Sequence, residues 1–335
     1  MQKRIIGPNE AGQRMDKYLS KYMDKAPKSF FYKMMRKKNI VLNGKKASGS
    51  EKLAEGDEIT FFLSDETIGK FAKAEASGNY QQVKRLAAGK HLPDIVYEDS
   101  GMLFFNKPAG VLSQKSKPGD ISLNEYLLGY LLNTKAVTEA ELASFTPAVC
   151  NRLDRNTSGL VAAGKTLSAL QELSRMFHDR SMNKYYLTIA AGEMKEEAHL
   201  DGWIARDEKS LKSKVYPKEQ ENLPEGAQRI ETSYVPLASN GKLTLLKVHL
   251  LTGRTHQIRA HLASQGHPLA GDTKYGGRKL NERLRQKYGL SHQLLHAWKL
   301  EFNCPKLTVT APPPALFCEI MKGEDLAWQP GTQED

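Results

Sequence analysis

The chain has 335 residues and a formal net charge of +11, from 49 lysines and arginines against 38 aspartates and glutamates. This length suffices for two domains or for one large domain with an appendage. A basic balance favours a polyanionic partner, nucleic acid before an anionic membrane. The cysteines at 150, 304 and 318 are far apart, which excludes a disulfide framework and a Cys-x-x-Cys site. No stretch approaches the roughly 18 apolar residues of a membrane helix, and the N-terminus lacks a signal-peptide core. We expect a soluble, cytoplasmic protein.

The positive charge is concentrated at the N-terminus. Residues 1–60 hold 14 lysines and arginines against 7 acidic residues, a net +7 that leaves +4 for the rest of the chain. Apolar spacing predicts a helix over 14–23, and a second helix is expected over 29–37 with Ser29 as its N-cap. A strand over 40–42 then meets Asn43-Gly44, a strong hairpin signal. With a further strand over 58–63, these elements predict a small basic module.

The rest of the chain is predicted to mix strands and helices. Residues 64–92 lack steady periodicity and are interpreted as a partly helical linker, and the polar residues 206–229 as a surface excursion. The elements do not alternate strictly, which favours an α+β fold over a doubly wound sheet. Strands are expected over 95–97, 102–105, 160–163, 185–190, 231–236 and 243–251, and helices over 123–132, 167–178 and 257–264.

One segment combines charge with turn-forming residues. Asp154 lies between Arg152 and Arg155, and Asn156-Thr157-Ser158-Gly159 follows. Two flanking cations would hold the aspartate ionised, because a nearby opposite charge lowers a carboxyl pKa. Such an aspartate is either part of a structural ion pair or a nucleophile beside a phosphate-binding site.

Residues 159–166 (GLVAAGKT) satisfy the phosphate-binding pattern G-x-x-x-x-G-K-[ST]. That mechanism needs a hydrophobic strand before the first glycine and a loop after it. Here charged residues come first, and residues 160–163 are themselves the expected strand. A nucleotide triphosphatase is therefore disfavoured.

Residues 252–261 (TGRTHQIRAH) lie at an expected strand-to-helix junction. A helix start there, with Arg254, suits a phosphate, whereas Arg259 one turn later could face a carboxylate. His256, His261 and His267 lack the i,i+4 spacing of a helical metal site, so structural histidines are expected instead.

Three segments together resemble the motifs of pseudouridine synthases of the RluA type. They are residues 152–159 (RLDRNTSG), residues 184–186 (KYY) with Gly192 six residues on, and residues 253–259 (GRTHQIR). Their order and spacing match as well. Flanking pieces at 106–110 (NKPAG), 266–268 (GHP), 271–272 (GD) and 295–297 (LHA) match too, and the similarity covers roughly residues 93–320.

The N-terminal unit separately resembles the alpha-L RNA-binding module of ribosomal protein S-four. The likeness rests on residues 14–19 (RMDKYL), 28–29 (KS) and 41–45 (VLNGK). Lys38-Asn39 replaces the common glycine of the module's turn, where Asn tolerates a positive φ. The resemblance implies sequence-tolerant phosphate contacts through Lys17, Lys28, Arg36, Lys37, Lys38 and Lys45.

The synthase resemblance implies isomerisation of uridine to pseudouridine in RNA without cofactor or metal. It implies that Asp154 is the essential aspartate, acting either by attack on the anomeric carbon or by removing a ribose proton to give a glycal. Arg259 would pair with Asp154, and Tyr186, rather than Tyr185, would pack on the base and assist proton removal from its carbon 5. The residues expected to bind the substrate are Arg152, Arg254 and His256. Asn151 stands where many members have His, and we expect altered local contacts there without loss of activity.

The resemblance implies a mixed, largely antiparallel sheet with a central cleft, preceded by the small RNA-binding domain. The predicted divisions are the module at 1–63, the linker at 64–92, the catalytic domain at 93–325 and a tail at 326–335. Large-subunit ribosomal RNA is the expected substrate and transfer RNA the alternative, and the family default is a monomer. The rival hypothesis is a non-catalytic RNA-binding or ribosome-assembly protein that kept the fold. Its expected mark, loss of Asp154, Tyr186 or Arg259, is absent from the sequence.

Overall fold

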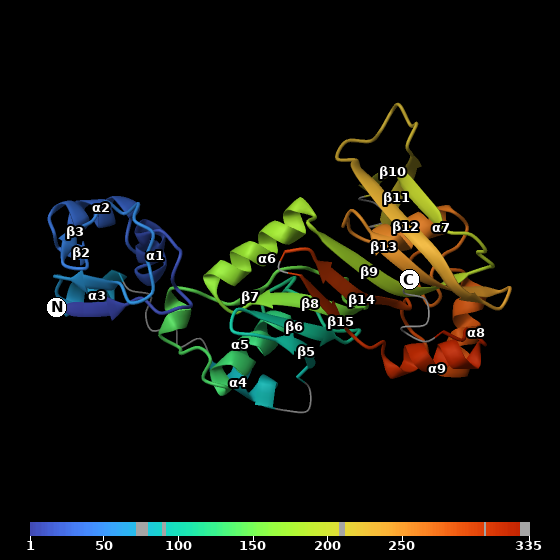
Figure 1. Ribbon diagram of the computed structural model, residues 1–335, viewed down its shortest axis with the longest axis horizontal. Helices are drawn as coiled ribbons and strands as arrows, with labels where there is room; N and C mark the ends of the chain where they lie inside the picture. Colours follow the sequence, from blue (N-terminus) through green and yellow to red (C-terminus); the bar gives the residue numbers. More distant parts are fainter. Residues whose placement is uncertain (72–79, 89–91, 208–211, 305, 329–335) are drawn as a thin grey trace. The chain divides into compact units, whose positions relative to one another are not determined.

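The computed structural model describes residues 1–71, 80–88, 92–207, 212–304 and 306–328 (Figure 1). They belong to two compact units. The first comprises residues 1–104, 114–151 and 162–175, and the second comprises residues 105–113, 152–161 and 176–335. The chain passes between the units several times, so each contains segments distant in sequence. The domain limits inferred from the sequence stay a prediction.

The first unit begins with a small four-stranded sheet and two amphipathic helices. The strand order is β1-β4-β2-β3. The helices pack apolar residues such as Met15, Leu19 and Phe31 against it, and all three are buried. The elements are β1 (Gln2–Ile5), α1 (Met15–Tyr22), α2 (Lys28–Arg36), β2 (Ile40–Leu42), β3 (Lys45–Lys46) and β4 (Glu58–Phe61).

The turns of this module partly match the predictions. Asn43 and Gly44 have φ of 50° and 72°, so the predicted hairpin turn is confirmed. The prediction of Ser29 as N-cap was wrong, because α2 begins at Lys28 and its N-cap position is Pro27. The left-handed residue after α2 is Lys38, with φ 60°, and not Asn39.

The predicted linker contains two helices, α3 (Asp65–Phe71) and α4 (Tyr80–Ala88); residues 72–79 and 89–91 lie outside the described residues. α4 packs closely on α5 (Leu123–Asn133). A Cβ added at Gly129 of α5 would lie 2.0 Å from the carbonyl oxygen of Val83, so only glycine permits this approach. α4 is therefore tightly packed within its unit.

The long sheet has the order β11-β10-β12-β13-β9-β14-β8-β6-β5, with β15 on β14 and β7 on β8. The pairs from β11 to β14 are antiparallel, whereas β14 and β8 run parallel. The prediction of an α+β fold with a mixed, largely antiparallel sheet is confirmed. The strands are β5 (Asp94–Glu98), β6 (Met102–Lys107), β7 (Ala148–Val149), β8 (Ser158–Gly164), β9 (Met182–Ala191), β10 (Ala198–Asp207), β11 (Lys212–Pro217), β12 (Gln228–Ser239), β13 (Leu243–Leu250), β14 (Leu295–Phe302) and β15 (Leu307–Thr310).

The remaining helices flank these strands. α7 contacts β11 and β12. α8 and α9 lie side by side (Figure 1). Arg283 of α8 donates two hydrogen bonds, of 3.2 and 2.9 Å, to the carboxylate of Glu324 just after α9. No helix of the described residues is long and apolar enough to cross a membrane. The helices are η1 (Glu141–Ala143), a 3-10 turn, and α6 (Leu167–Asp179), α7 (Gln257–Ser264), α8 (Arg278–Tyr288) and α9 (Ala315–Gly323).

Some elements departed from expectation. The predicted helix at 257–264 is confirmed as α7. The surface excursion predicted at 206–229 was wrong in part, because β11 and the start of β12 lie within it. β10, β14, β15, α8 and α9 were not predicted. β11 carries mostly polar, exposed or half-buried side chains, so it lacks the apolar alternation that identifies a strand.

Candidate active site

Asp154 lies in a loop between Asn151 and β8, and the loop is held by its neighbours. The hydroxyl of Ser113 donates to the carbonyl of Leu153 at 3.2 Å and accepts from its N–H at 3.0 Å. The N–H of Thr157 donates to the carbonyl of Asp154 at 3.0 Å. The backbone on both sides of the aspartate is therefore fixed. The Asp154 side chain itself is 26 % exposed, which leaves it open to a substrate.

A buried lysine supports the same loop. Lys107, at the end of β6, is 0 % exposed, and its ammonium donates to the carbonyls of Pro108, Val111 and Arg155 at 3.0, 2.9 and 3.0 Å. Burial lowers the pKa of Lys107 to about 7, and the negative charge of Asp154 opposes that shift. Three carbonyl acceptors match the three donors of an ammonium, so the side chain joins two segments of backbone.

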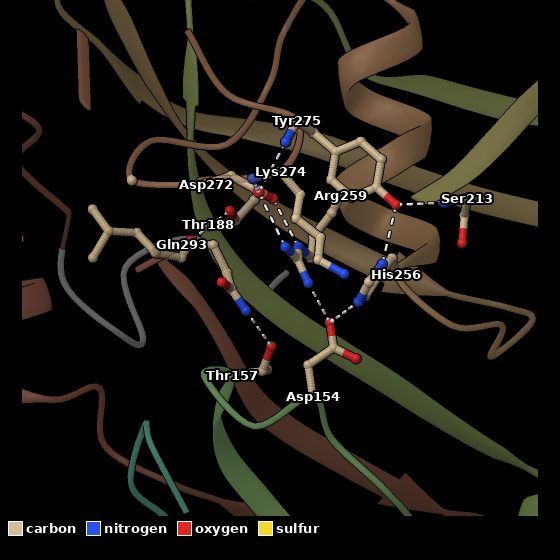
Figure 2. Close-up of polar contacts among 12 residues, drawn as sticks. Asp154, Thr157, Thr188, Ser213, His256, Arg259, Asp272, Lys274, Tyr275 and Gln293 are labelled. Atoms are coloured by element: carbon tan, nitrogen blue, oxygen red, sulfur yellow. Dashed lines mark hydrogen bonds and ion pairs between the residues drawn. The ribbon is translucent and has the colours of Figure 1, made fainter. Parts of the chain in front are cut away.

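Arg259 is the cation that pairs with Asp154. Its Nη1 lies 2.8 Å from Oδ2 of Asp154, although the residues are 105 positions apart in the chain (Figure 2). Arg259 also donates to Asp272 through Nε at 2.7 Å and Nη2 at 3.0 Å. The guanidinium thus bridges two carboxylates, and its planar fork fixes the direction of the third nitrogen.

Asp272 is completely buried and fixes the position of Arg259. Its Oδ1 also accepts from the N–H groups of Lys274 and Tyr275, at 2.8 and 3.1 Å. Burial opposes ionisation of Asp272, yet the hydrogen bonds and charge of Arg259 hold the pKa of its carboxyl below the usual range. Asp272 is therefore an anion that anchors the arginine.

The cations expected beside Asp154 do not bind it. Within the described residues neither Arg152 nor Arg155 forms an ion pair with the aspartate. Arg152 is exposed, and Arg155 donates its Nε to the carbonyl of Gly110 at 3.0 Å. The prediction of flanking cations was wrong, because the Arg155 side chain binds the Gly110 carbonyl and the Arg152 side chain faces solvent.

His256 faces the aspartate as well. Its Nε2 lies 3.7 Å from Oδ2 of Asp154, and its Nδ1 lies 3.0 Å from the hydroxyl of Tyr275 (Figure 2). Burial lowers the pKa of the imidazole, while the charge of Asp154 acts in the opposite direction. His256 has a left-handed backbone, with φ 57° and ψ 19°, an uncommon conformation for a residue with a side chain.

Tyr186 lies on β9 and packs in an apolar cluster with Val248, Leu295 and others. It is 8 % exposed, and burial, with a further contribution from the charge of Asp154, raises the pKa of its phenol. Strand alternation sends Tyr185 to the opposite face, where its ring stacks on that of His249 at 4.8 Å. Tyr186 is therefore the tyrosine on the Asp154 side.

Arg254 precedes α7 and is half-buried. Its N–H donates to the side chain of Gln257 at 3.0 Å, and its buried Nε has no hydrogen-bond partner within the described residues. The expected RNA-binding cations of the small module are all exposed; they are Lys17, Lys28, Arg36, Lys37, Lys38 and Lys45.

The other two histidines have structural partners. Nδ1 of His261 lies 3.1 Å from the hydroxyl of Thr232, and Nδ1 of His267 lies 2.8 Å from the carbonyl of Ala191. No group of three or more His, Cys, Asp or Glu side chains in the described ranges is placed to hold a metal ion.

The phosphate-loop pattern at 159–166 is not a loop. Residues 158–164 form β8, and a Cβ added at Gly159 would lie 2.2 Å from the carbonyl oxygen of Ala297. Lys165 pairs with Glu98 at 2.6 Å. The glycine permits close strand packing and the lysine is already paired, so neither is arranged to cradle a phosphate.

Asn151 has a structural contact, since its side-chain oxygen accepts from the N–H of Ala162 at 2.8 Å. The sequence reasoning gave no role to Lys107, Asp272 or Tyr275. Two of them carried a signal, because Lys107 and Asp272 lie in flanking pieces that match the family; Tyr275 carried none.

Comparisons with known proteins show which family the chain resembles. A family model described as RNA pseudouridylate synthase matches residues 101–264. The ribosomal large subunit pseudouridine synthase C of Escherichia coli (strain K12) is 31 % identical over 305 residues, which cover 90 % of this chain and 88 % of that protein. The protein of the same name from Vibrio vulnificus (strain CMCP6) is 30 % identical over 301 residues, with 90 % and 88 % covered. A solved structure, human RNA pseudouridylate synthase domain containing 4, superposes with a TM-score of 0.60 at 22 % identity, over 73 % of this chain and 98 % of that one.

Proposed function

Because the chain belongs to the RNA pseudouridylate synthase family, in its RluA type, we propose that it isomerises uridines of large-subunit ribosomal RNA, with Asp154 as the essential aspartate. The protein is an RNA pseudouridine synthase, an isomerase. The choice of ribosomal RNA rests on the relatives' names, which specify the ribosomal large subunit.

The Asp154–Arg259 ion pair is the observation that carries the proposal. Both Arg259 and His256 approach Oδ2 of the carboxylate, and within the described residues Oδ1 receives no hydrogen bond (Figure 2). One oxygen is thus engaged and the other is available to a ribose. That arrangement serves both routes open to the aspartate, attack on the anomeric carbon and removal of a ribose proton to give a glycal.

Tyr186 is proposed to pack on the target base. Burial raises its pKa, so the phenol is protonated at neutral pH. A protonated phenol supports the packing role more strongly than proton removal from carbon 5. Arg152, which is exposed, and Arg254, whose Nε is unpaired, are proposed to contact the RNA near the target nucleotide.

The RNA must present a base that is normally stacked. Extruding it costs a few kcal/mol, which protein contacts must offset. The exposed cations Lys17, Lys28, Arg36, Lys37, Lys38 and Lys45 of the small module are proposed to bind phosphates without sequence preference. Such contacts make binding strongly salt dependent. We also propose that the protein works in the cytoplasm, as a monomer.

The test is pseudouridine mapping on unmodified large-subunit ribosomal RNA. The wild type is expected to form pseudouridine at defined positions, and Asp154→Asn to form none while still binding RNA. Asp201→Asn is the matched control, because Asp201 is also ion-paired, to Arg229 at 2.9 Å, within the same unit. RNA binding without product from the wild type would favour the rival, a non-catalytic RNA-binding protein. Product only on transfer RNA would redirect the substrate assignment.

A further inference from the structure

The hydroxyl of Tyr275 joins three elements beside the candidate active site. It lies 2.7 Å from the N–H of Ser213 on β11 and 3.0 Å from Nδ1 of His256, at the start of α7. The backbone of Tyr275 is held by Asp272, at 3.1 Å. Figure 2 shows these contacts as a continuous chain that ends at Asp154.

Chemistry fixes the direction of the first hydrogen bond in this chain and favours one direction for the second. The N–H of Ser213 can only donate, so the tyrosine oxygen accepts there. The Tyr275 oxygen, which already accepts one hydrogen bond, is better placed to donate its single proton to the lone pair on Nδ1 of His256 than to accept a second hydrogen bond. When Tyr275 donates to Nδ1, the ring proton of a neutral imidazole resides on Nε2.

The opposite side of the ring favours the same tautomer. Nε2 of His256 faces Oδ2 of Asp154 at 3.7 Å. A lone pair on Nε2 would face the carboxylate and be repelled, whereas an N–H is attracted. Asp154 thus favours the Nε2–H form from a distance, and the hydrogen bond from Tyr275 is the closer of the two contacts that favour it.

Building on the isomerase function proposed above, we propose that Tyr275 is a positioning residue that selects the Nε2–H tautomer of His256. His256 then presents a neutral N–H to Oδ2 of Asp154. Arg259 donates a hydrogen bond to Oδ2 at 2.8 Å and the His256 N–H faces the same oxygen at 3.7 Å, which leaves Oδ1 to the substrate.

The charges around the imidazole keep it neutral. Asp154 and Asp272 face it and favour its protonation, while Arg259, Lys274 and burial oppose protonation, and the net effect lowers the pKa of His256. A neutral donor orients the carboxylate without adding a second cation.

The backbone of His256 supports a functional constraint. Its left-handed φ of 57° is costly for a residue with a Cβ and persists only where surrounding contacts fix it. The ring of Tyr275 also packs edge-on to His256 at 5.7 Å and beneath the guanidinium of Arg259 at 5.4 Å. Tyr275→Phe keeps these ring contacts and removes only the hydroxyl, which makes it the informative variant.

The direct test is spectroscopic and needs no RNA. Full-length protein labelled with 15N in its histidine rings is examined near neutral pH, and the His256 signals are assigned by their loss in His256→Gln. The wild type is expected to show a protonated Nε2 and an unprotonated Nδ1, and Tyr275→Phe to show a mixture of tautomers. A wild type protonated on Nδ1, or an unchanged tautomer in Tyr275→Phe, overturns the inference.

The kinetic test separates positioning from packing. Tyr275→Phe is expected to lower kcat by about 10- to 100-fold, as for a small displacement of a reacting group, with little change in KM. The acid limb of its pH profile should move to higher pH, because the neutral imidazole loses a donor to Nδ1. In the His256→Ala background the same substitution should have no further effect, since Tyr275 acts through His256. Additive effects overturn the inference.

The matched control is Tyr130→Phe, which removes a hydroxyl that donates to Glu98 at 2.7 Å within the first unit. Its kcat and pH profile should equal those of the wild type. Absence of pseudouridine from the wild type would overturn the proposed function, while the tautomer result would still decide the state of His256. The two failures are therefore distinguishable.

Discussion

Asp272 holds Arg259 by two hydrogen bonds and thereby directs the remaining guanidinium nitrogen at Asp154. The completely buried carboxylate of Asp272 can affect catalysis without contacting the substrate, because it fixes the orientation of the rigid Arg259 guanidinium that binds Asp154. Removing this anchor should affect both stability and turnover.

The first prediction concerns Asp272→Asn. The substitution leaves the buried Arg259 with one fewer charged partner, and breaking a buried pair costs about 3–5 kcal/mol of unfolding free energy. Denaturant unfolding should show that loss, and kcat should fall more than RNA affinity. Asp201→Asn, which breaks an exposed pair, should cost less than about 1 kcal/mol. Equal losses in the two variants would contradict a special role for Asp272.

The second prediction concerns the pH dependence of stability at Lys107. Burial lowers the pKa of this lysine from 10.5 to about 7, so between these values the unfolded chain binds more protons than the folded one. Stability from this group therefore rises with pH across that window. The wild type should gain unfolding free energy relative to Lys107→Met as pH rises from 7 toward 10.5.

Lys165→Met is the control for that measurement, because Lys165 pairs at 2.6 Å with Glu98. An equal rise in unfolding free energy relative to Lys165→Met would mean that the trend does not come from the buried Lys107. If the difference in unfolding free energy between the wild type and Lys107→Met does not change with pH, the three carbonyl acceptors fully offset the effect of burial on the pKa of Lys107.

The third prediction concerns Gly159, where a Cβ would lie 2.2 Å from the carbonyl oxygen of Ala297 and φ is 110°. Gly159→Ala should cost about 2–4 kcal/mol, because a forced positive φ and overpacking both contribute. Gly226→Ala is matched, since Gly226 has φ 76° with nothing within 4 Å of its added Cβ. It should cost only about 1–2 kcal/mol. Thermal unfolding of both variants measures the difference, and equal costs would show that φ alone matters.

The fourth prediction concerns RNA binding by the small module. Replacing Lys37, Lys38 and Lys45 by Gln should reduce the slope of log affinity against log salt by about 0.7–0.9 for each phosphate that the wild-type lysines neutralise. kcat at saturating RNA should not change. Binding is measured between about 50 and 200 mM salt.

A control triple variant at Lys195, Lys242 and Lys322, with the same change of charge, distinguishes specific contacts from net charge. These lysines lie in the second unit. An equal decrease of the slope in both triple variants would indicate that overall charge, and not the module, sets the salt dependence.

Only those site residues that lie within family motifs could be predicted from the sequence. The pairing of Asp154 with Arg259 was expected from the resemblance, and the ion pair is present at 2.8 Å. The prediction drawn from neighbouring charges was wrong, because Arg152 and Arg155 lie close to Asp154 in the sequence but do not pair with it. Proximity along the chain does not bring two side chains together, whereas a contact across 105 positions depends on the tertiary fold.

The polar support of the site could not be predicted from local patterns. The contact between Ser213 and Tyr275 joins the polar strand β11 to a loop. Neither segment has the regular spacing of apolar residues from which its position in the fold could be predicted. The strands and helices found correctly, such as α7 and β8, are those with apolar runs or clear boundaries. β10 and β11 combine charged and apolar positions, so pairing with neighbours decides their conformation.

The separation of Asp154 and Arg259 along the chain has a consequence for synthesis. A ribosome that adds about 5–20 residues per second completes the 105-residue interval in roughly 5–20 s. During that time the aspartate has left the ribosome without its arginine, and β14, which pairs with β8 beside the loop, is made later still. A nascent chain therefore cannot modify RNA until nearly all of its sequence has been translated.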